Sequence, residues 1–241
     1  MKTIVRIAAL VLVTAAATLG CTAQADQTTD KLKATLQARL GDATVKGIAK
    51  SPIPGLYEVN LGSQIVYSDA AGDYVLLGEL VDTKSRKNLT EARMAEINKV
   101  DFASLPLGNA IKVVKGNGAR KIAVFSDPNC PYCKRFESTL QSMDNVTVYT
   151  FLYPVLTPDS TVKSKAIWCA SDRAKSWENW MVNHQAPTGA GNCDTTALDK
   201  NLALGRGLNV TGTPTIILAD GTRLPGAVSA DELNNALASV K

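Results

Sequence analysis

Histidine is almost absent from this chain of 241 residues, in which His184 is the only one, and aromatic residues make up only 5% of the sequence. A catalytic triad would have to use His184, and no serine nucleophile motif accompanies it. After the N-terminal segment, no apolar run approaches the roughly 20 residues that a membrane-spanning helix needs. The 26 basic and 22 acidic residues nearly balance, and no basic stripe with interleaved aromatics indicates a nucleic-acid partner.

Residues 1–25 have the pattern of an export signal. Two basic residues precede an apolar run that ends near Ala17 and is too short to span a membrane. Ala23-Gln24-Ala25 has the small-x-small pattern that signal peptidases cleave, so we expect a mature chain that begins at Asp26. In the alternative interpretation, a lipoprotein signal, Cys21 is acylated and anchors the chain in a membrane.

Four cysteines remain after either processing: Cys130, Cys133, Cys169 and Cys193. An exported protein folds in an oxidising compartment, where four cysteines can form two disulfides. Cys169 lies inside a helical pattern and Cys193 in a loop, and we expect these two to form a structural disulfide. Closing a loop of about 25 residues stabilises a fold by roughly 3 kcal/mol.

Cys130 and Cys133 stand three positions apart at the start of a predicted helix, after an apolar strand pattern over residues 121–125. Free backbone N–H groups and the helix dipole at that end stabilise a thiolate. We therefore expect Cys130 to be the exposed nucleophile that attacks a substrate disulfide. Cys133, one turn further along the helix, is placed to attack the resulting mixed disulfide. Pro131 fits the first helical turn, where its missing N–H costs no hydrogen bond.

Two other roles for this pair are compatible with the sequence. A zinc site would need Cys169, Cys193 or His184 as further ligands, although none of these belongs to a second close pair. A purely structural disulfide between Cys130 and Cys133 would close too small a loop to stabilise the fold much. The β-α-β pattern around the pair is typical of redox use, so we expect neither a metal nor another cofactor.

Hydrophobic periodicity predicts two α+β regions joined by a helix. In residues 26–86, a helix over 29–40 precedes strands at 56–61, 64–68 and 74–80. This region buries too little surface to be stable alone, and we expect it to self-associate. Residues 87–105 contain a capped linker helix that begins after Asn88 and runs to about Val100. In residues 106–241 we expect strands at 121–125, 146–152, 215–218 and 224–228, and helices at 130–143, 161–182, 196–208 and after Ser229.

Three motifs resemble the DsbC/DsbG family of periplasmic thiol:disulfide interchange proteins. They are Phe125–Cys133 with its Cys-Pro-Tyr-Cys sequence, Ala166–Ala170 together with Cys193, and Val210–Thr215 before a strand. The resemblance covers essentially the whole chain after the signal and implies a periplasmic α+β protein. It implies a thioredoxin-like catalytic domain with a helical insertion at residues 106–241, preceded by a small α+β dimerisation domain at 26–86 and a linker helix at 87–105.

The resemblance also implies a substrate-binding surface around the cysteine pair. In thioredoxin-fold proteins the proline that matches Pro214 is cis, and the backbone of the residue before it, here Thr213, pairs with an extended substrate. Pro131 and Tyr132, between the two cysteines, belong to the same implied surface. Threonine before the cis-proline is typical of the isomerases, whereas the best-known isomerase has glycine in place of Pro131 and DsbG-like relatives share Cys-Pro-Tyr-Cys.

The function implied by the resemblance is that of a thiol:disulfide isomerase or reductase, which rearranges incorrect disulfides in exported proteins. Its implied partners are misfolded disulfide-containing proteins, a second copy of the chain in a homodimer, and a DsbD-like membrane reductase that keeps the pair reduced. Two alternatives fit the same residues. One is a DsbG-like reductase of sulfenylated cysteines, and the other is a chaperone that binds unfolded chains in the dimer cleft.

Overall fold

The computed structural model describes residues 20–240, which form two compact units, one up to Gly78 and one from Glu79 on. The export signal expected over residues 1–25 falls mainly on residues 1–19, which lie outside the described residues. In the described part of the chain, no helix has the length and the apolar character needed to cross a membrane.

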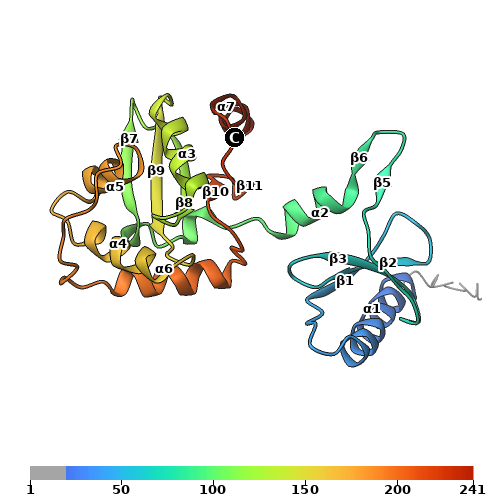
Figure 1. Ribbon diagram of the computed structural model, residues 1–241. Coiled ribbons are helices and arrows are strands. Elements are labelled where there is room, and N and C mark those ends of the chain that lie inside the picture. The colour runs from blue at the N-terminus through green and yellow to red at the C-terminus, as the bar shows by residue number, and fades with distance from the viewer. Residues whose placement is uncertain (1–19, 241) are drawn as a thin grey trace, which may run out of the picture. The chain divides into compact units, whose positions relative to one another are not determined.

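The first unit packs one long helix on a small antiparallel sheet (Figure 1). Leu32 and Leu36 lie one turn apart on the helix and are buried against Val59 and Val66 of the sheet. The predicted helix is confirmed, but it begins well before the predicted start at residue 29. The elements are α1 (Gly20–Arg39) and the strands β1 (Gly47–Lys50), β2 (Leu56–Asn60), β3 (Ile65–Asp69) and β4 (Val75–Leu76), which pair in chain order.

The tight loop between β3 and β4 requires a glycine. Gly72 has φ +73°, and a Cβ at this position would lie 3.1 Å from Leu32 Cδ1. Its carbonyl oxygen accepts a hydrogen bond of 2.7 Å from Arg39 at the end of α1. The loop is closed by Asp69, whose carboxylate accepts the backbone N–H of Tyr74 at 2.9 Å. These contacts hold the loop against the helix.

The second unit begins with a hairpin, β5 (Val81–Asp82) and β6 (Lys87–Asn88), followed by α2 (Leu89–Ile97). Asn88 caps α2 as predicted, because its side chain accepts the N–H of Glu91 at 3.0 Å. The helix ends at Ile97 rather than near Val100. Val100 has left the helix because its side chain is buried in the core and its N–H donates to the carbonyl of Gly221 at 3.0 Å.

A five-stranded mixed sheet forms the centre of the second unit (Figure 1). Its strand order is β11-β10-β8-β9-β7, with β8 and β9 parallel and every other neighbouring pair antiparallel. Helix α3 (Pro131–Gln141) connects β8 to β9, so the predicted β-α-β unit is confirmed. Strand β7 was not predicted. The strands are β7 (Ile111–Lys115), β8 (Arg120–Ser126), β9 (Val146–Leu152), β10 (Thr215–Leu218) and β11 (Arg223–Pro225).

Both faces of this sheet are buried, and successive residues of β8 serve opposite faces. Ile122 and Val124 belong to a cluster with side chains of α3 and α7 (Ala230–Ser239). Ala123 and Phe125 belong to a second cluster, with side chains of α6 (Thr196–Gly207) and of the short 3-10 helices Phe102–Ser104 and Leu107–Asn109. The continuous apolar run in β8 follows from this burial on both sides.

The region predicted as one helix over residues 161–182 is two helices, α4 (Pro158–Trp168) and α5 (Arg173–Met181). The prediction was wrong because the chain breaks after Cys169, and Asp172 caps a new helix by accepting the N–H of Lys175 at 2.9 Å. Trp168 and Trp177 are buried in one cluster with both cysteines of the Cys-x-x-Cys motif. The two helices therefore help to build the core around the pair.

Candidate active site

The loop between β8 and α3 places Cys130 at the N-cap of α3. The N–H of Cys133 is directed at Cys130 Sγ at 3.4 Å, in the manner of an N-cap hydrogen bond. Pro131 occupies the first turn, where no N–H is needed. Both cysteines are free thiols. A negative charge that develops on Cys130 Sγ would therefore meet the free N–H groups of the helix end.

Cys130 is buried rather than exposed, which differs from the expectation. The residue is only 3% exposed and belongs to a core cluster, and its Sγ lies 3.2 Å from the carbonyl oxygen of Thr213, to which the thiol can donate. The peptide bond between Thr213 and Pro214 is cis. Tyr132, between the cysteines, is 58% exposed. The structure thus brings together the motif cysteines and the Thr213-Pro214 loop, which lies 83 positions away in the sequence.

Cys133 lies deeper in the core and has no solvent exposure. Burial raises the pKa of its thiol; a hydrogen bond with the Ser126 side chain opposes this rise, and the neighbouring Cys130 adds to it. Since a thiolate is the attacking species in exchange, this raised pKa makes Cys133 a poor nucleophile at neutral pH. The two cysteines therefore lie in different electrostatic environments.

Asp127 connects the loop before Cys130 to the segment before α4. Its carboxylate is fully buried and accepts four hydrogen bonds. Oδ1 accepts from the backbone N–H of Asn129 at 2.8 Å and from Ser160 Oγ at 2.7 Å. Oδ2 accepts from the N–H groups of Val155 at 2.8 Å and Leu156 at 3.0 Å. A buried carboxyl group with this many donors is well compensated, and these hydrogen bonds fix the backbone that carries Cys130.

A tryptophan and two lysines lie beside the β8–α3 loop, and sequence reasoning missed them. Trp180 of α5 donates its indole N–H to the carbonyl of Pro128 at 2.6 Å. The ammonium groups of Lys134 and Lys163 lie 4.0 and 4.8 Å from its ring centroid. Burial lowers the pKa of Lys134, and the charge of Lys163 lowers it further. Because these groups come from three different helices, no local pattern in the sequence could group them.

The other two cysteines form a disulfide, Cys169–Cys193, with an S–S distance of 2.08 Å and a sequence separation of 24. The thiolates that the zinc alternative would need from Cys169 and Cys193 are thereby used in a covalent bond. Over residues 20–240, no group of three or more histidine, cysteine or acidic side chains converges on one point. His184 lies in the loop after α5 with its side chain exposed.

Comparison with known proteins matches two family models to the chain. The thioredoxin-like domain matches residues 107–241. The disulfide bond isomerase protein N-terminal domain matches residues 22–91. The two models together account for both units, with the thioredoxin-like model on the unit that contains the cysteine pair.

Relatives with similarity along most of the chain are thiol:disulfide interchange proteins. The probable thiol:disulfide interchange protein DsbC of Bordetella pertussis is 47% identical over 208 residues, which are 86% of this chain and 74% of that protein. The thiol:disulfide interchange protein DsbC of Escherichia coli K12 is 28% identical over 215 residues, 85% of this chain and 86% of that protein. A crystal structure of a disulfide interchange protein from Neisseria gonorrhoeae has 40% identity and a TM-score of 0.53, and covers 56% of this chain and 96% of that one.

The fold and the cysteine pair of this chain agree with these comparisons. A thioredoxin-like unit carries a free Cys-Pro-Tyr-Cys pair at a helix end, and an isomerase-type N-terminal domain precedes it. The identity to DsbC proteins extends over both units. The chain therefore belongs to the DsbC family of thiol:disulfide interchange proteins, which are thiol-disulfide oxidoreductases and isomerases.

Proposed function

We propose that this protein is a periplasmic disulfide isomerase in which Cys130 attacks substrate disulfides and Cys133 resolves stalled intermediates. The observation that carries the proposal is the position of Cys130. It is a free thiol at the N-cap of α3, with its sulfur 3.2 Å from the Thr213 carbonyl. The backbone N–H of Cys133 is directed at this sulfur, and the Thr213 backbone is close enough to align an extended substrate with it.

In the proposed cycle, the thiolate of Cys130 attacks one sulfur of a substrate disulfide. That S–S bond breaks, a mixed disulfide forms between Cys130 and the substrate, and the second substrate sulfur leaves as a thiolate. The released thiolate attacks another disulfide of the same substrate. When a substrate thiolate then displaces Cys130, the protein is regenerated as a thiol, and no net electron transfer has occurred.

The burial of Cys133 supports isomerisation over simple reduction. Because burial raises the pKa of its thiol, Cys133 attacks Cys130 Sγ slowly, and the mixed disulfide lasts long enough for the substrate to rearrange. When Cys133 does attack, the substrate leaves reduced by two electrons and the protein holds a Cys130–Cys133 disulfide. An external dithiol must return the two electrons, and we propose a DsbD-like membrane reductase as that donor.

The surface around the cysteine pair suits an unfolded chain. Tyr132, Val155 and Leu156 are large apolar side chains that are 58%, 47% and 51% exposed. Val155 and Leu156 belong to the segment that Asp127 ties to the cysteine loop. We propose that these side chains, with Pro131 and the backbone of Thr213, contact misfolded exported proteins through apolar surface and strand-like hydrogen bonds.

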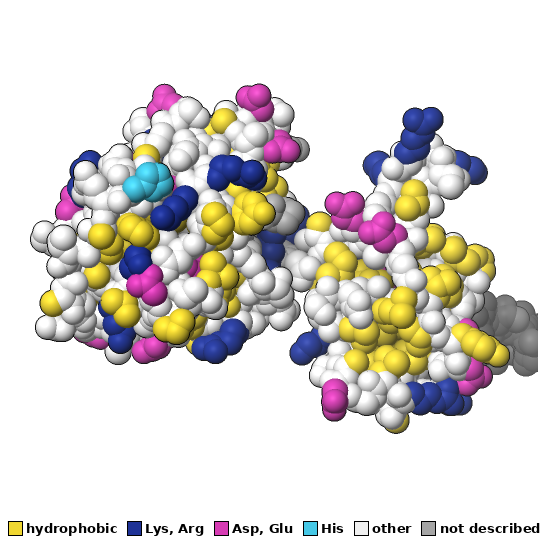
Figure 2. Space-filling model, viewed as in Figure 1, with side chains coloured by type: hydrophobic (Ala, Val, Ile, Leu, Met, Phe, Trp, Pro, Cys, Tyr) yellow, Lys and Arg dark blue, Asp and Glu magenta, His cyan; other side chains and the backbone are white. Residues whose placement is uncertain are grey.

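We also propose that the first unit forms a homodimer through the edge strand β4. Its neighbourhood exposes Tyr74, Val75, Leu76 and Leu77, which are 79%, 37%, 55% and 74% exposed. Within residues 20–240, strand β4 pairs with β3 alone, so its other backbone edge is available to a second copy. Figure 2 shows hydrophobic side chains gathered on one face of this unit.

Strand addition at β4 would complete a sheet across two copies and cover these side chains. Leu77→Glu should shift the protein from dimer to monomer in analytical ultracentrifugation. A matched exposed apolar residue of the second unit, Val162, is 65% exposed, and Val162→Glu should leave the dimer intact. A wild-type monomer at micromolar concentration would contradict the dimer proposal without affecting the cysteine chemistry.

The isomerase proposal is tested by refolding scrambled ribonuclease with catalytic amounts of the reduced protein. Wild type should restore ribonuclease activity, and Cys130→Ala should abolish this rescue, because the attacking sulfur is lost. Cys133→Ala should retain attack by Cys130 and accumulate the mixed disulfide, which is visible as a covalent complex on non-reducing gels. Equal rescue by wild type and Cys130→Ala would contradict the proposal.

The two alternative functions give different results in parallel assays. The Cys-Pro-Tyr-Cys sequence favours a reductase of sulfenic acids as the second candidate, and such an enzyme would reduce a sulfenylated single-cysteine protein faster than it repairs ribonuclease. A chaperone would suppress aggregation of a cysteine-free client equally well with Cys130 or with alanine at that position. We expect the ribonuclease assay to give the largest rate difference between wild type and Cys130→Ala.

A further inference from the structure

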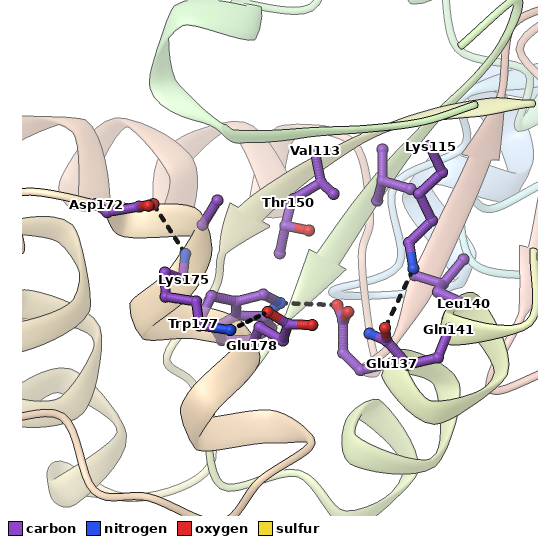
Figure 3. A pocket seen from close by; sticks show the side chains of 12 residues that line it. Val113, Lys115, Glu137, Leu140, Gln141, Thr150, Asp172, Lys175, Trp177 and Glu178 are labelled. Carbon is purple, nitrogen blue, oxygen red and sulfur yellow. Dashed lines mark hydrogen bonds and ion pairs between the residues drawn. The ribbon is translucent and has the colours of Figure 1, made fainter. Parts of the chain in front are cut away.

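A cavity of about 260 Å³ lies between the sheet and helices α3 and α5 of the second unit, and neither motif cysteine lines it. Figure 3 shows side chains of β7 and β9 on one side, with Trp177 and Glu178 of α5 and Glu137 of α3 facing them. Most of its wall is apolar. The apolar lining side chains are Val113, Leu140, Val148, Ala174 and Trp177.

Glu137 is the buried ionisable group of this cavity, and Thr150 is a second buried polar residue in its lining. Glu137 is only 7% exposed, and its Oε1 accepts the indole N–H of Trp177 at 2.8 Å. Among the described residues, Oε2 has no hydrogen-bond or ion-pair partner, although it is not sealed from the cavity. A buried carboxyl group with one free oxygen is costly unless a donor reaches it. The cavity thus holds a strong acceptor in apolar surroundings.

The other charged side chains at the cavity have polar partners at its rim (Figure 3). Lys115 of β7 donates to Gln141 at 3.3 Å, and Lys175 pairs with Glu178 at 3.1 Å on α5. Asp172 accepts the backbone N–H of Lys175 as the cap of α5. No lysine forms an ion pair with Glu137 in the described part of the chain, although the charge of Lys115 acts on it from the rim. A direct cationic partner for Glu137 would therefore be a ligand.

We propose that this cavity binds a small organic cation, a protonated primary alkylamine joined to a single aromatic ring by a short chain, whose ammonium group donates to Glu137 Oε2. The aromatic stem would contact the Trp177 ring and the aliphatic side chains of Leu140 and Val113. An apolar pocket with one well-placed charged group is the usual design of a small-molecule site, and charge-assisted hydrogen bonds are the strong ones. This binding site is separate from the disulfide chemistry and goes beyond it.

The test uses the full mature protein with its cysteine pair reduced, and 2-phenylethylamine as the probe. The indole N–H signal of Trp177 in a proton–nitrogen NMR spectrum, assigned with Trp177→Phe, reports on the cavity because it donates to Glu137. We expect a saturable shift with 2-phenylethylamine at pH 8. The neutral isostere 2-phenylethanol should bind at least about tenfold more weakly, since its hydroxyl lacks the charge, and phenylacetate should bind more weakly still.

Affinity for the amine should also rise between pH 6 and pH 8. Burial raises the pKa of Glu137 to about 7; the Trp177 hydrogen bond and Lys115 oppose this rise, and Glu178 adds to it. Asp172 and Lys175 are the remaining charged groups that line the cavity. Because the amine pairs with the carboxylate form, its binding strengthens as that form becomes populated, whereas the alcohol should show little pH dependence.

Glu137→Gln should reduce the amine affinity to that of the alcohol, because the amide keeps an acceptor for Trp177 but removes the charge. Glu178→Gln, at the rim, should change the amine affinity less than twofold. Equal binding of amine and alcohol by wild type at pH 8, or tighter binding of phenylacetate, would overturn the proposal even if Glu137→Gln failed to fold. An unchanged amine affinity in folded Glu137→Gln would overturn it as well.

Discussion

Glu137 lies on the buried face of α3, and replacing it with glutamine tests how burial controls its ionisation. Burial raises the pKa of the Glu137 carboxyl from its ordinary 4.5 to about 7. The Trp177 hydrogen bond and the charge of Lys115 limit that rise, and Glu178 adds to it. Glutamine has nearly the same shape and still offers an oxygen to the Trp177 N–H, which is 2.8 Å away. The substitution therefore removes the titration and little else.

The direction of the pH effect on stability follows from comparing the protonation of Glu137 in the folded and unfolded protein. The folded protein keeps a proton on Glu137 that the unfolded chain releases once the pH passes 4.5, until the folded carboxyl also ionises near pH 7. The contribution of this group to stability is therefore fully present below about pH 4.5 and is lost as the pH rises toward 7. A rise from 4.5 to about 7 corresponds to about 3 kcal/mol, at about 1.4 kcal/mol per pH unit.

Glu137→Gln should lack this decline, because an amide does not titrate. The free energy of unfolding of the variant relative to wild type should increase by about 3 kcal/mol between pH 4 and pH 8. Urea unfolding followed by tryptophan fluorescence at several pH values measures the difference. Glu178→Gln is the matched control, because its carboxylate is 39% exposed and is paired with Lys175. Its stability should follow the wild-type pH profile.

Parallel pH profiles for wild type and Glu137→Gln would refute the reasoning. They would mean that the carboxyl ionises at the same pH in the folded and unfolded states, so that burial does not control it. A variant that is less stable than wild type by a constant amount would show only the loss of a contact. The raised pKa of Glu137 is supported only if the difference in free energy of unfolding between Glu137→Gln and wild type grows between pH 4.5 and 7.

Three further predictions concern stability and the cysteine loop. Replacing Cys169 and Cys193 together by serine should lower the free energy of unfolding by about 3 kcal/mol, because the bridge spans 24 positions. Urea unfolding measures this difference. As a control, reducing the wild-type protein should lower its free energy of unfolding by the same amount. Gly72→Ala should lower the free energy of unfolding by roughly 1–3 kcal/mol, because Gly72 has φ +73° and a new Cβ would contact α1. Gly55→Ala should lower it by about 1 kcal/mol, because Gly55 has φ +81° but no heavy atom lies near a new Cβ. Equal losses in urea unfolding would show that packing at Gly72 is unimportant. Asp127→Asn puts an NH₂ group where a carboxylate oxygen accepts two backbone N–H groups. The substitution should lower the free energy of unfolding by about 2–4 kcal/mol and slow ribonuclease repair. An unchanged melting temperature would contradict the role assigned to this carboxylate.

Elements with local signals were predicted well from the sequence. The strand over Val146–Leu152 has the predicted limits, because seven residues of high β-propensity end at turn residues on both sides. Ser229 caps the last helix in a complete capping box with Glu232, as its spacing predicts. Strand β7 has a weak pattern of its own, IKVVK, and exists because it pairs with β9. Its pairing partner is more than thirty positions away.

The helical insertion shows why periodicity alone can mislead. Apolar spacing continues from α4 into α5, so the sequence predicts one helix across the break. The structure ends α4 at Trp168 and starts α5 at Arg173, where the disulfide of Cys169 and the cap at Asp172 redirect the chain. A disulfide partner 24 positions away leaves no trace in a window of helical length.

The sequence by itself determined the chemistry of the site: the paired thiols, the helix end that carries Cys130, and the disulfide partners Cys169 and Cys193. The thiol pair and its helix end depend on residue identity and on spacing within a few turns, which a linear chain states directly. The disulfide follows from the cysteine count, because Cys169 and Cys193 remain once Cys130 and Cys133 are paired. Only the tertiary structure decided that Cys130 is buried beside Thr213 and that Glu137 faces a cavity next to Trp177. Burial and its effect on ionisation depend on what packs against a group, and those neighbours come from 83 and 40 positions away.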